Sequence, residues 1–379
     1  MKIKNTITTI VISAMLAGCS IPASSITSEK EMTIYANTSV SEVFDTVYSY
    51  SEYTTDKTQA KQRYEDSLSL LTSCNQLFDI YNDYEGINNL KTINDHAGIE
   101  PVKVDPVIID MLKRAKMFYE LSDGEFDVTQ GSLLKVWHEY RTEGITLNTQ
   151  GQLAPVPGID ELEQAHEKGG WDCVVIDEEN STVYISEAGA SLDVGGIAKG
   201  YAAELAAQQM IIEGMEAGFL NVGRNIRLVG NKPDGKNWVI GIADPSGENP
   251  DGIVTITLDQ PLSIVTSGDY ERYYIGEDGN SYSHIIDPET LYPATLYRSV
   301  SILTPVSGDA DCLSTALFTL TIEEGKKLIE AYESETGNSV DVIWIMSEEQ
   351  KQDTDTVSIG DLYGAYTTGL EGRLAWANS

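Results

Sequence analysis

The segment Ser191-Leu-Asp-Val-Gly-Gly-Ile-Ala-Lys-Gly-Tyr-Ala-Ala-Glu204 changes character at two adjacent glycines. Apolar residues flank Asp193 as in a short strand, and beyond the glycines they recur at every fourth position, which predicts a helix. The first amides of such a helix have no partner within it, so this turn can hold an anion against the backbone. Asp193 and Lys199 add opposite charges on the two sides of the turn. Alone, a two-glycine turn more often makes an ordinary connection between strand and helix, with a solvated lysine.

The composition restricts the partners that this chain can bind. Its 379 residues, 41% of them hydrophobic, are enough for one large domain or two packed domains. The net charge of −34 at pH 7 repels nucleic acid and anionic lipid headgroups, so we expect no nucleic-acid partner. A ligand that carries phosphate must therefore be held by local groups, which can be backbone amides, a lysine or a metal ion.

The first residues have the pattern of an export signal. Lys2 and Lys4 precede the apolar run Ile7–Leu16, which is too short to span a bilayer. The run continues into Ala17-Gly18-Cys19, and the whole resembles a bacterial lipoprotein signal that is cleaved before Cys19, with lipid on its sulfur. The alternative is an ordinary secretory signal followed by a chance cysteine.

We therefore predict a signal peptide over residues 1–18, a flexible tether over residues 19–32, and a folded part over residues 33–379. The folded part is either one compact unit or two intertwined subdomains. The lipid would place it at the cell membrane, on the extracytoplasmic face. The other cysteines are odd in number and lack metal-ligand spacing, so they indicate no disulfide framework and are expected to be buried: Cys74, Cys173 and Cys312.

The rest of the chain alternates amphipathic helical patterns with short apolar strands. Helices are predicted over residues 57–80, 105–121, 133–140, 310–320 and 323–332, and residues 88–98 are predicted to be a loop. Strands are predicted within residues 33–54 and over residues 173–176, 183–185, 192–194, 219–222, 226–229, 238–243, 253–258, 270–276, 281–286, 299–304 and 340–346. Helices separated by hairpin-connected strands are typical of an α+β fold, with mostly antiparallel sheets packed against helices.

Three further segments carry side chains suited to phosphate chemistry. His284 ends a predicted strand, although a lone histidine is more often structural. Thr266–Arg272 turns at a glycine, and forms either a ligand-facing loop or an ordinary turn. Asp311 and Thr315 are four residues apart and share a helix face, where a carboxylate and a hydroxyl can bind a hard cation such as Mg²⁺. The commoner role of such a pair is a helix cap and a core filler.

Five blocks occur together in one order, and on them the chain resembles the FAD:protein FMN transferase family over roughly residues 40–345. The blocks are Gly124-Glu-Phe-Asp-Val-Thr-Gln-Gly131 followed by Trp137, then Asp193–Ala202, Thr266–Arg272, His284–Pro288 and Asp311–Ala316. The chain departs from the family at three places. It has Phe44-Asp45-Thr46 for Met-Gly-Thr, Gly223-Arg224-Asn225 for Gly-Gly-Asp, and Thr290-Leu-Tyr-Pro293 for Thr-Gly-Tyr-Pro.

The resemblance implies a role for each matching residue. Asp193 and Lys199 would contact FAD, and His284 would lie beside the reacting phosphate. A metal ion would be held by the carbonyl of Gly196, with Asp311 and Thr315. The remaining residues would line the cleft for the flavin nucleotide: Tyr81, Phe126, Asp127 and Ala294.

The resemblance further implies an Mg²⁺-dependent enzyme that cleaves FAD, attaches FMN through a phosphoester to a threonine of an acceptor envelope protein, and releases AMP. His284 titrates near neutrality and suits the base that activates the hydroxyl. One alternative is an FAD pyrophosphatase that uses water and gives FMN and AMP. The other is a lipoprotein that only binds flavin, which would need no base. The chain lacks the Ser/Thr-Gly-Ala-Thr-like segment of family acceptors, so we expect it to modify a partner.

Overall fold

The computed structural model describes residues 32–377. The predicted signal peptide and the lipidation site Cys19 lie outside these residues, as does the predicted tether except for Met32. The division of the chain at residues 18 and 32 stays a prediction. Within residues 32–377, no helix is long and apolar enough to cross a bilayer.

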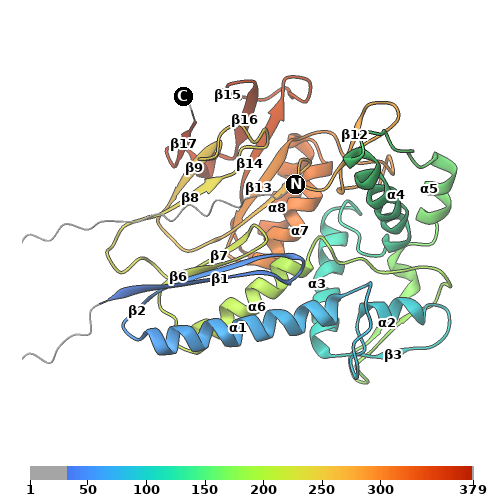
Figure 1. Ribbon diagram of the computed structural model, residues 1–379, viewed down its shortest axis with the longest axis horizontal. Coiled ribbons are helices and arrows are strands. Elements are labelled where there is room, and N and C mark those ends of the chain that lie inside the picture. Colours follow the sequence, from blue (N-terminus) through green and yellow to red (C-terminus); the bar gives the residue numbers. More distant parts are fainter. Residues whose placement is uncertain (1–31, 378–379) are drawn as a thin grey trace, which may run out of the picture.

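One large sheet organises the described part of the chain, and all its neighbouring strands run antiparallel (Figure 1). It has nine strands, in the order β1 Thr33–Val43, β2 Thr46–Thr54, β6 Gly218–Val222, β7 Asn225–Val229, β10 Ser263–Gly268, β13 Ser299–Thr304, β14 Asp341–Ser347, β16 Leu362–Tyr366 and β15 Val357–Ile359. With the helices packed on it, this sheet confirms the predicted α+β class with mostly antiparallel strands.

Eight helices and three small sheets complete the described residues. The helices are α1 Lys57–Phe78, α2 Leu90–Asp95, α3 Pro106–Leu121, α4 Gly131–Thr149, α5 Ile159–His166, α6 Ala198–Ile212, α7 Ser307–Thr319 and α8 Ile322–Thr336. The small sheets join β17 Leu374–Trp376, β9 Val254–Leu258 and β8 Trp238–Ile242; β3 Val102–Lys103, β5 Thr182–Ile185 and β4 Val174–Asp177; and β11 Tyr274–Ile275 with β12 Ser281–Tyr282.

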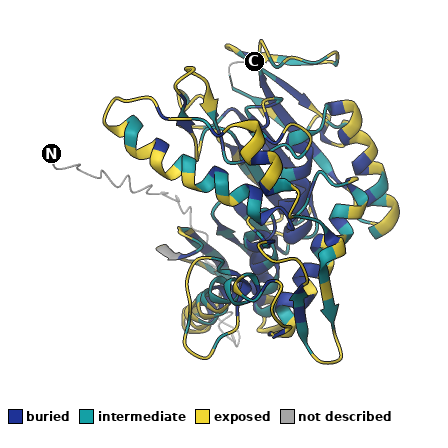
Figure 2. Ribbon diagram, turned by 90° about the vertical axis from the view of Figure 1, so that its right-hand side faces the viewer, coloured by how far each residue is buried: buried dark blue, intermediate teal, exposed yellow. Residues whose placement is uncertain are grey.

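In the middle of the large sheet, both faces are buried. Successive side chains of a strand point to opposite faces, so alternate residues belong to two different cores. In β14, Val342, Trp344 and Met346 belong to the core shared with α1, α6 and α7. Ile343 and Ile345 belong to a second core, shared with β8, β9 and β17. Figure 2 shows the same distribution, with buried residues in the interior strands and exposed residues on the outer turns of the helices.

Local signals fix several helix ends as the sequence predicted. Asp105 caps α3 by accepting a hydrogen bond from Val107 N at 2.9 Å, and Pro106 occupies the first turn. Thr321 and Glu324 form a capping box at the start of α8. Cys74 and Cys312 are buried as predicted, whereas Cys173 is half-buried.

Several sequence predictions were wrong. The segment 192–194 forms no strand, because the amide of Asp193 donates to Val128 O at 2.8 Å in a loop rather than to a strand. Residues 88–98 contain the short helix α2, which Asn89 initiates through a capping box. The strands around residue 278 are only two residues long. Six further elements were not predicted: α5, β3, β10, β15, β16 and β17.

Helices α6 and α7 cross closely and cap each other. Asp311 of α7 accepts a hydrogen bond from the amide of Gly200 in the first turn of α6, at 2.9 Å. Glu204 of α6 accepts one from the amide of Ser307, the first residue of α7, at 2.9 Å, and also pairs with Arg227. Each helix therefore supplies a carboxylate to the free amides at the start of the other.

The crossing depends on the absence of a side chain at Gly200. A Cβ there would lie 2.4 Å from Ser307 O, which is backbone and cannot rotate away. We expect Gly200→Ala to lower the free energy of unfolding by about 1–3 kcal/mol, measured by denaturant unfolding. The matched control is Gly158→Ala, because a Cβ at Gly158 meets nothing within 4 Å. Equal stability of the two variants would contradict this account of the crossing.

Candidate functional site

The turn at Gly195-Gly196 is held against the loop that precedes α4. Asp193 N donates to Val128 O at 2.8 Å, and the amide of Gly131 donates to Ser191 O at 3.0 Å. A Cβ on Gly196 would lie 2.9 Å from the ring of buried Phe126. Phe126 therefore leaves no room for a side chain at residue 196, so this position presents backbone atoms only.

The segments that carry the three predicted metal ligands lie side by side. A Cβ on Gly196 would come within 3.1 Å of Thr315 Oγ1, so the backbone of α6 begins beside that hydroxyl. Asp311 lies one turn before Thr315 on α7. The hydroxyl of Thr315 donates a hydrogen bond to the backbone oxygen of Asp311 at 3.3 Å. A carbonyl, a carboxylate and a hydroxyl are the oxygen donors that a hard cation prefers.

Asp311 is buried, which makes its charge costly. Burial raises the pKa of its carboxyl group, and the nearby ammonium of Lys199 opposes that rise. Lys199 Nζ lies 3.6 Å from Asp311 Oδ2 and donates to Gly195 O at 3.2 Å. A cation beside Asp311 would offset the cost further. Within residues 32–377, no group of three His, Cys, Asp or Glu side chains could hold a metal, so water and substrate would have to complete the coordination.

Asp193 is held at the opposite side of the glycine turn from Lys199. Its Oδ1 accepts a hydrogen bond from Gly195 N at 2.8 Å, which shapes the turn. Burial raises the pKa of this carboxyl group, while the same hydrogen bond and the charges of Arg141, His138 and Lys199 lower it. Asp193 thus connects the glycine turn to cationic side chains on α4.

His284 is half-buried, and its Nδ1 has no hydrogen-bond partner in the described part of the chain. Burial, followed by the charges of Arg141, Arg272 and Lys199, lowers the pKa of His284 to about 3. The imidazole is therefore neutral at pH 7, and a ring nitrogen is available to accept a proton.

Sequence reasoning missed an aromatic and cationic group beside this site. His138 Nδ1 lies 3.3 Å from the hydroxyl of Tyr81 and 3.3 Å from Nη2 of Arg141. The rings of Tyr81 and His138 are 5.0 Å apart between centroids. The predicted helix over residues 133–140 ended one residue before Arg141. The three-residue spacing of His138 and Arg141, which places both on one face of α4, was the available signal.

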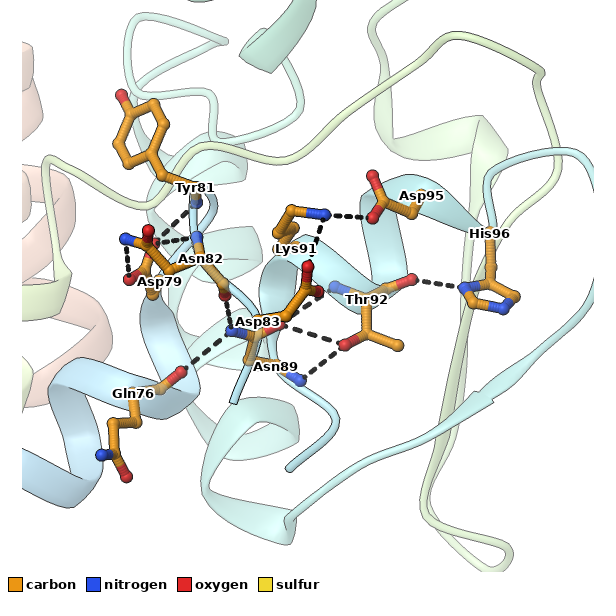
Figure 3. A network of polar contacts seen from close by, with 10 residues as sticks. All are labelled: Gln76, Asp79, Tyr81, Asn82, Asp83, Asn89, Lys91, Thr92, Asp95 and His96. Carbon is orange, nitrogen blue, oxygen red and sulfur yellow. Dashed lines mark hydrogen bonds and ion pairs between the residues drawn. The ribbon is translucent and has the colours of Figure 1, made fainter. Parts of the chain in front are cut away.

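Tyr81 is positioned by a network of polar contacts in the loop after α1 (Figure 3). Asp79 accepts hydrogen bonds from the amide of Tyr81 at 2.6 Å and from the amide of Asn82 at 3.1 Å. The fully buried Asn89 donates to Gln76 O at 3.1 Å and to Asn82 O at 2.9 Å. Figure 3 shows the phenol of Tyr81 pointing away from this network, so the network fixes the backbone while the ring contacts His138.

The last two predicted residues, Asp127 and Ala294, make hydrogen bonds that shape the loops in which they lie. The carboxylate of Asp127 accepts from Thr129 N at 2.9 Å, Thr129 Oγ1 at 2.7 Å and Gln130 Nε2 at 3.2 Å, so it shapes its own loop. Buried Ala294 donates its amide to Ile285 O at 2.9 Å, next to His284. Two surface hollows, lined by residues such as Asp244, Arg298 and Asp361, contain none of the predicted site residues.

The site and the fold have counterparts in known proteins. The model of the ApbE family matches residues 44–338. An FAD:protein FMN transferase of Treponema pallidum (strain Nichols) is 34% identical over 275 residues, which are 69% of this chain and 71% of that protein. The FAD:protein FMN transferase of Klebsiella pneumoniae (strain 342) is 30% identical over 284 residues, 74% of this chain and 84% of that one. The crystal structure of the ApbE protein of Thermotoga maritima has a TM-score of 0.69 and 32% identity, covering 82% of this chain and 94% of that one.

The lowered pKa of His284 can be measured directly. Because the folded pKa lies below the ordinary value, the imidazole should stay neutral as the pH falls from about 8 to about 5. We expect its NMR signals to remain constant over that range, with His284→Asn used to assign them. A midpoint near the ordinary histidine value of about 6.5 would show that the ring is hydrated and not desolvated.

Proposed function

Because this chain belongs to the ApbE family, we propose that it is an FAD:protein FMN transferase. The substrate is FAD, and the acceptor is the hydroxyl of a threonine in another protein. A bond forms between that oxygen and the phosphorus of the FMN moiety, the bond from this phosphorus to the bridging oxygen breaks, and AMP leaves with that oxygen. The observation that carries the proposal is the meeting of Asp311 and Thr315 with the backbone at Gly196.

Asp311, Thr315 and the carbonyl of Gly196 are the residues that would hold Mg²⁺. When bound, such an ion neutralises phosphate charge that develops as the diphosphate is cleaved. Lys199 contributes a second positive charge beside Asp311. The local positive charge matters in this chain, since a net charge of −34 would otherwise repel a dinucleotide.

His284 is the residue that would accept the proton of the threonine hydroxyl. It is neutral at pH 7, and its Nδ1 has no partner among the described residues, so one ring nitrogen is free for this task. The weak basicity of the free imidazole would increase next to the negative phosphates of a bound substrate. Asp193 and Tyr81, with Phe126, Asp127 and Ala294, would line the nucleotide side of the site.

The proposal includes the place of action. The sequence around Cys19 supports a lipid anchor, and the anchor would hold the enzyme on the extracytoplasmic face of the membrane. An acceptor must approach a strongly acidic body, so its loop around the threonine should be neutral or basic.

The metal assignment predicts the effect of Asp311→Asn. The amide keeps an oxygen for the hydrogen bond from Gly200 N but loses the negative charge, so the fold should survive while transfer falls about 100-fold or more. Transfer is measured at increasing Mg²⁺, and thermal unfolding checks the fold. The control is Asp361→Asn, on an exposed turn before β16. Wild-type turnover of Asp311→Asn in Mg²⁺ would remove Asp311 from the metal site.

The transfer itself is tested by mass spectrometry. The mature protein is incubated with FAD, Mg²⁺ and a peptide that contains a Ser-Gly-Ala-Thr segment, and AMP release is followed in parallel. We expect the peptide to gain one FMN and the enzyme to keep its own mass. The His284→Ala variant should neither modify the peptide nor release AMP. AMP release without peptide modification would make the protein a pyrophosphatase, and a stable FMN adduct on the enzyme would place the acceptor within this chain.

A further inference from the structure

Two arginines of this acidic chain lack a carboxylate partner. The chain has 59 acidic residues and eight arginines, and all eight arginines lie in the described part. Six of these arginines form ion pairs with carboxylates: Arg63, Arg114, Arg224, Arg227, Arg298 and Arg373. Within residues 32–377, Arg141 and Arg272 form none, although acidic side chains outnumber basic ones more than twofold.

Both unpaired arginines belong to the elements that surround the site. Helix α4, which carries Arg141, begins beside Ser191, since the amide of Gly131 donates to Ser191 O at 3.0 Å. Farther along, α4 packs on β11, where a Cβ on Gly144 would lie 2.5 Å from the ring of Tyr274. Arg272 lies just before β11, and the chain continues from β12 to His284. Helix α4 thus bridges the glycine turn and the hairpin that leads to His284.

Arg141 is partly withdrawn from water without being neutralised. Its side chain is half-buried, and burial lowers the pKa of its guanidinium group. The hydrogen bond that it makes in the described structure joins Nη2 to His138 Nδ1 at 3.3 Å. A guanidinium has five N–H donors in a planar fork, so most of them are left to point at something other than this chain. A half-buried charge of this kind is stabilised by an anionic partner.

We propose that Arg141, assisted by Arg272, binds the phosphate oxygens of the FAD diphosphate. The inference rests on the proposed function and adds a second, metal-independent contact to the same substrate. The planar fork of an arginine matches two phosphate oxygens at once, which fixes orientation as well as charge. The predicted cation ligands come from α6 and α7, whereas this contact comes from α4 and the segment before β11. The diphosphate would therefore be held from two separate parts of the fold.

This contact would act on specificity and positioning rather than on proton transfer. It recognises the phosphates of the dinucleotide and contributes nothing to a flavin without phosphate. The position of Arg141 next to Tyr81 and His138 would place the phosphate contact beside aromatic surfaces suited to a ring of the nucleotide. Loss of the arginine should therefore weaken FAD binding while leaving riboflavin binding unchanged.

The test compares FAD with riboflavin by calorimetry on the full mature protein, without acceptor and with EDTA. The variants are Arg141→Gln, Arg141→Lys and Arg272→Gln, and the matched control is Arg373→Gln, which removes an arginine from a surface pair with Asp259. We expect Arg141→Gln to weaken FAD binding about 10-fold or more, with riboflavin affinity unchanged. Arg141→Lys should retain part of the affinity, because it keeps the charge but loses the fork. Arg272→Gln should have a smaller effect, since that side chain is exposed.

Unchanged FAD affinity of Arg141→Gln would overturn the inference, and so would an equal loss for FAD and riboflavin, which would make Arg141 a structural residue. If thermal unfolding shows that Arg141→Gln does not fold, the same comparison of FAD and riboflavin affinity is made with Arg141→Lys. The proposed function fails separately: wild-type protein that binds FAD but releases no AMP with Mg²⁺ and acceptor is not a transferase, whatever Arg141 does.

Discussion

The close crossing of α6 and α7 is the constraint on which the rest of the site depends. Gly200 leaves no room for a side chain against Ser307 O, and the two helices supply carboxylates to each other's first amides. The same crossing brings Asp311 and Thr315 of α7 to the turn at Gly196. A single packing contact therefore stabilises the fold and brings together residues from two distant parts of the sequence.

The second constraint is electrostatic. A chain with a net charge of −34 must bind a dinucleotide that is itself negative, and a few cationic side chains near the candidate site would offset the repulsion. Burial, followed by the charges of Arg141, Arg272 and Lys199, lowers the pKa of His284 and keeps its imidazole neutral. The remaining arginines form ion pairs with carboxylates in the described structure, so Arg141 and Arg272 are the two arginines of residues 32–377 without such a partner.

The sequence by itself determined the fold class and most of the longer elements, and it supplied the candidate site residues. Helices α1, α3 and α8 could be predicted because the spacing of their apolar residues and their capping residues indicate the same boundaries. Asp105 at the start of α3 is an example. Asp311 and Thr315 could be placed on one helix face from their spacing alone. The interpretation of the site as a phosphate site came from five sequence blocks that occur together in the order of the family, since none of these blocks is decisive alone.

Only the tertiary structure decided how these parts meet. The segment 192–194 has an alternating pattern but pairs with the loop at Val128, because the neighbouring strand that a ladder needs is absent there. The sequence alone did not place Arg141 and His138 near the site, since their place depends on the bridge that α4 makes between Ser191 and β11. Local propensity acts over a few residues and is readable from the sequence. Contacts between residues more than a hundred positions apart are fixed by the packing of the whole core, which no local pattern encodes.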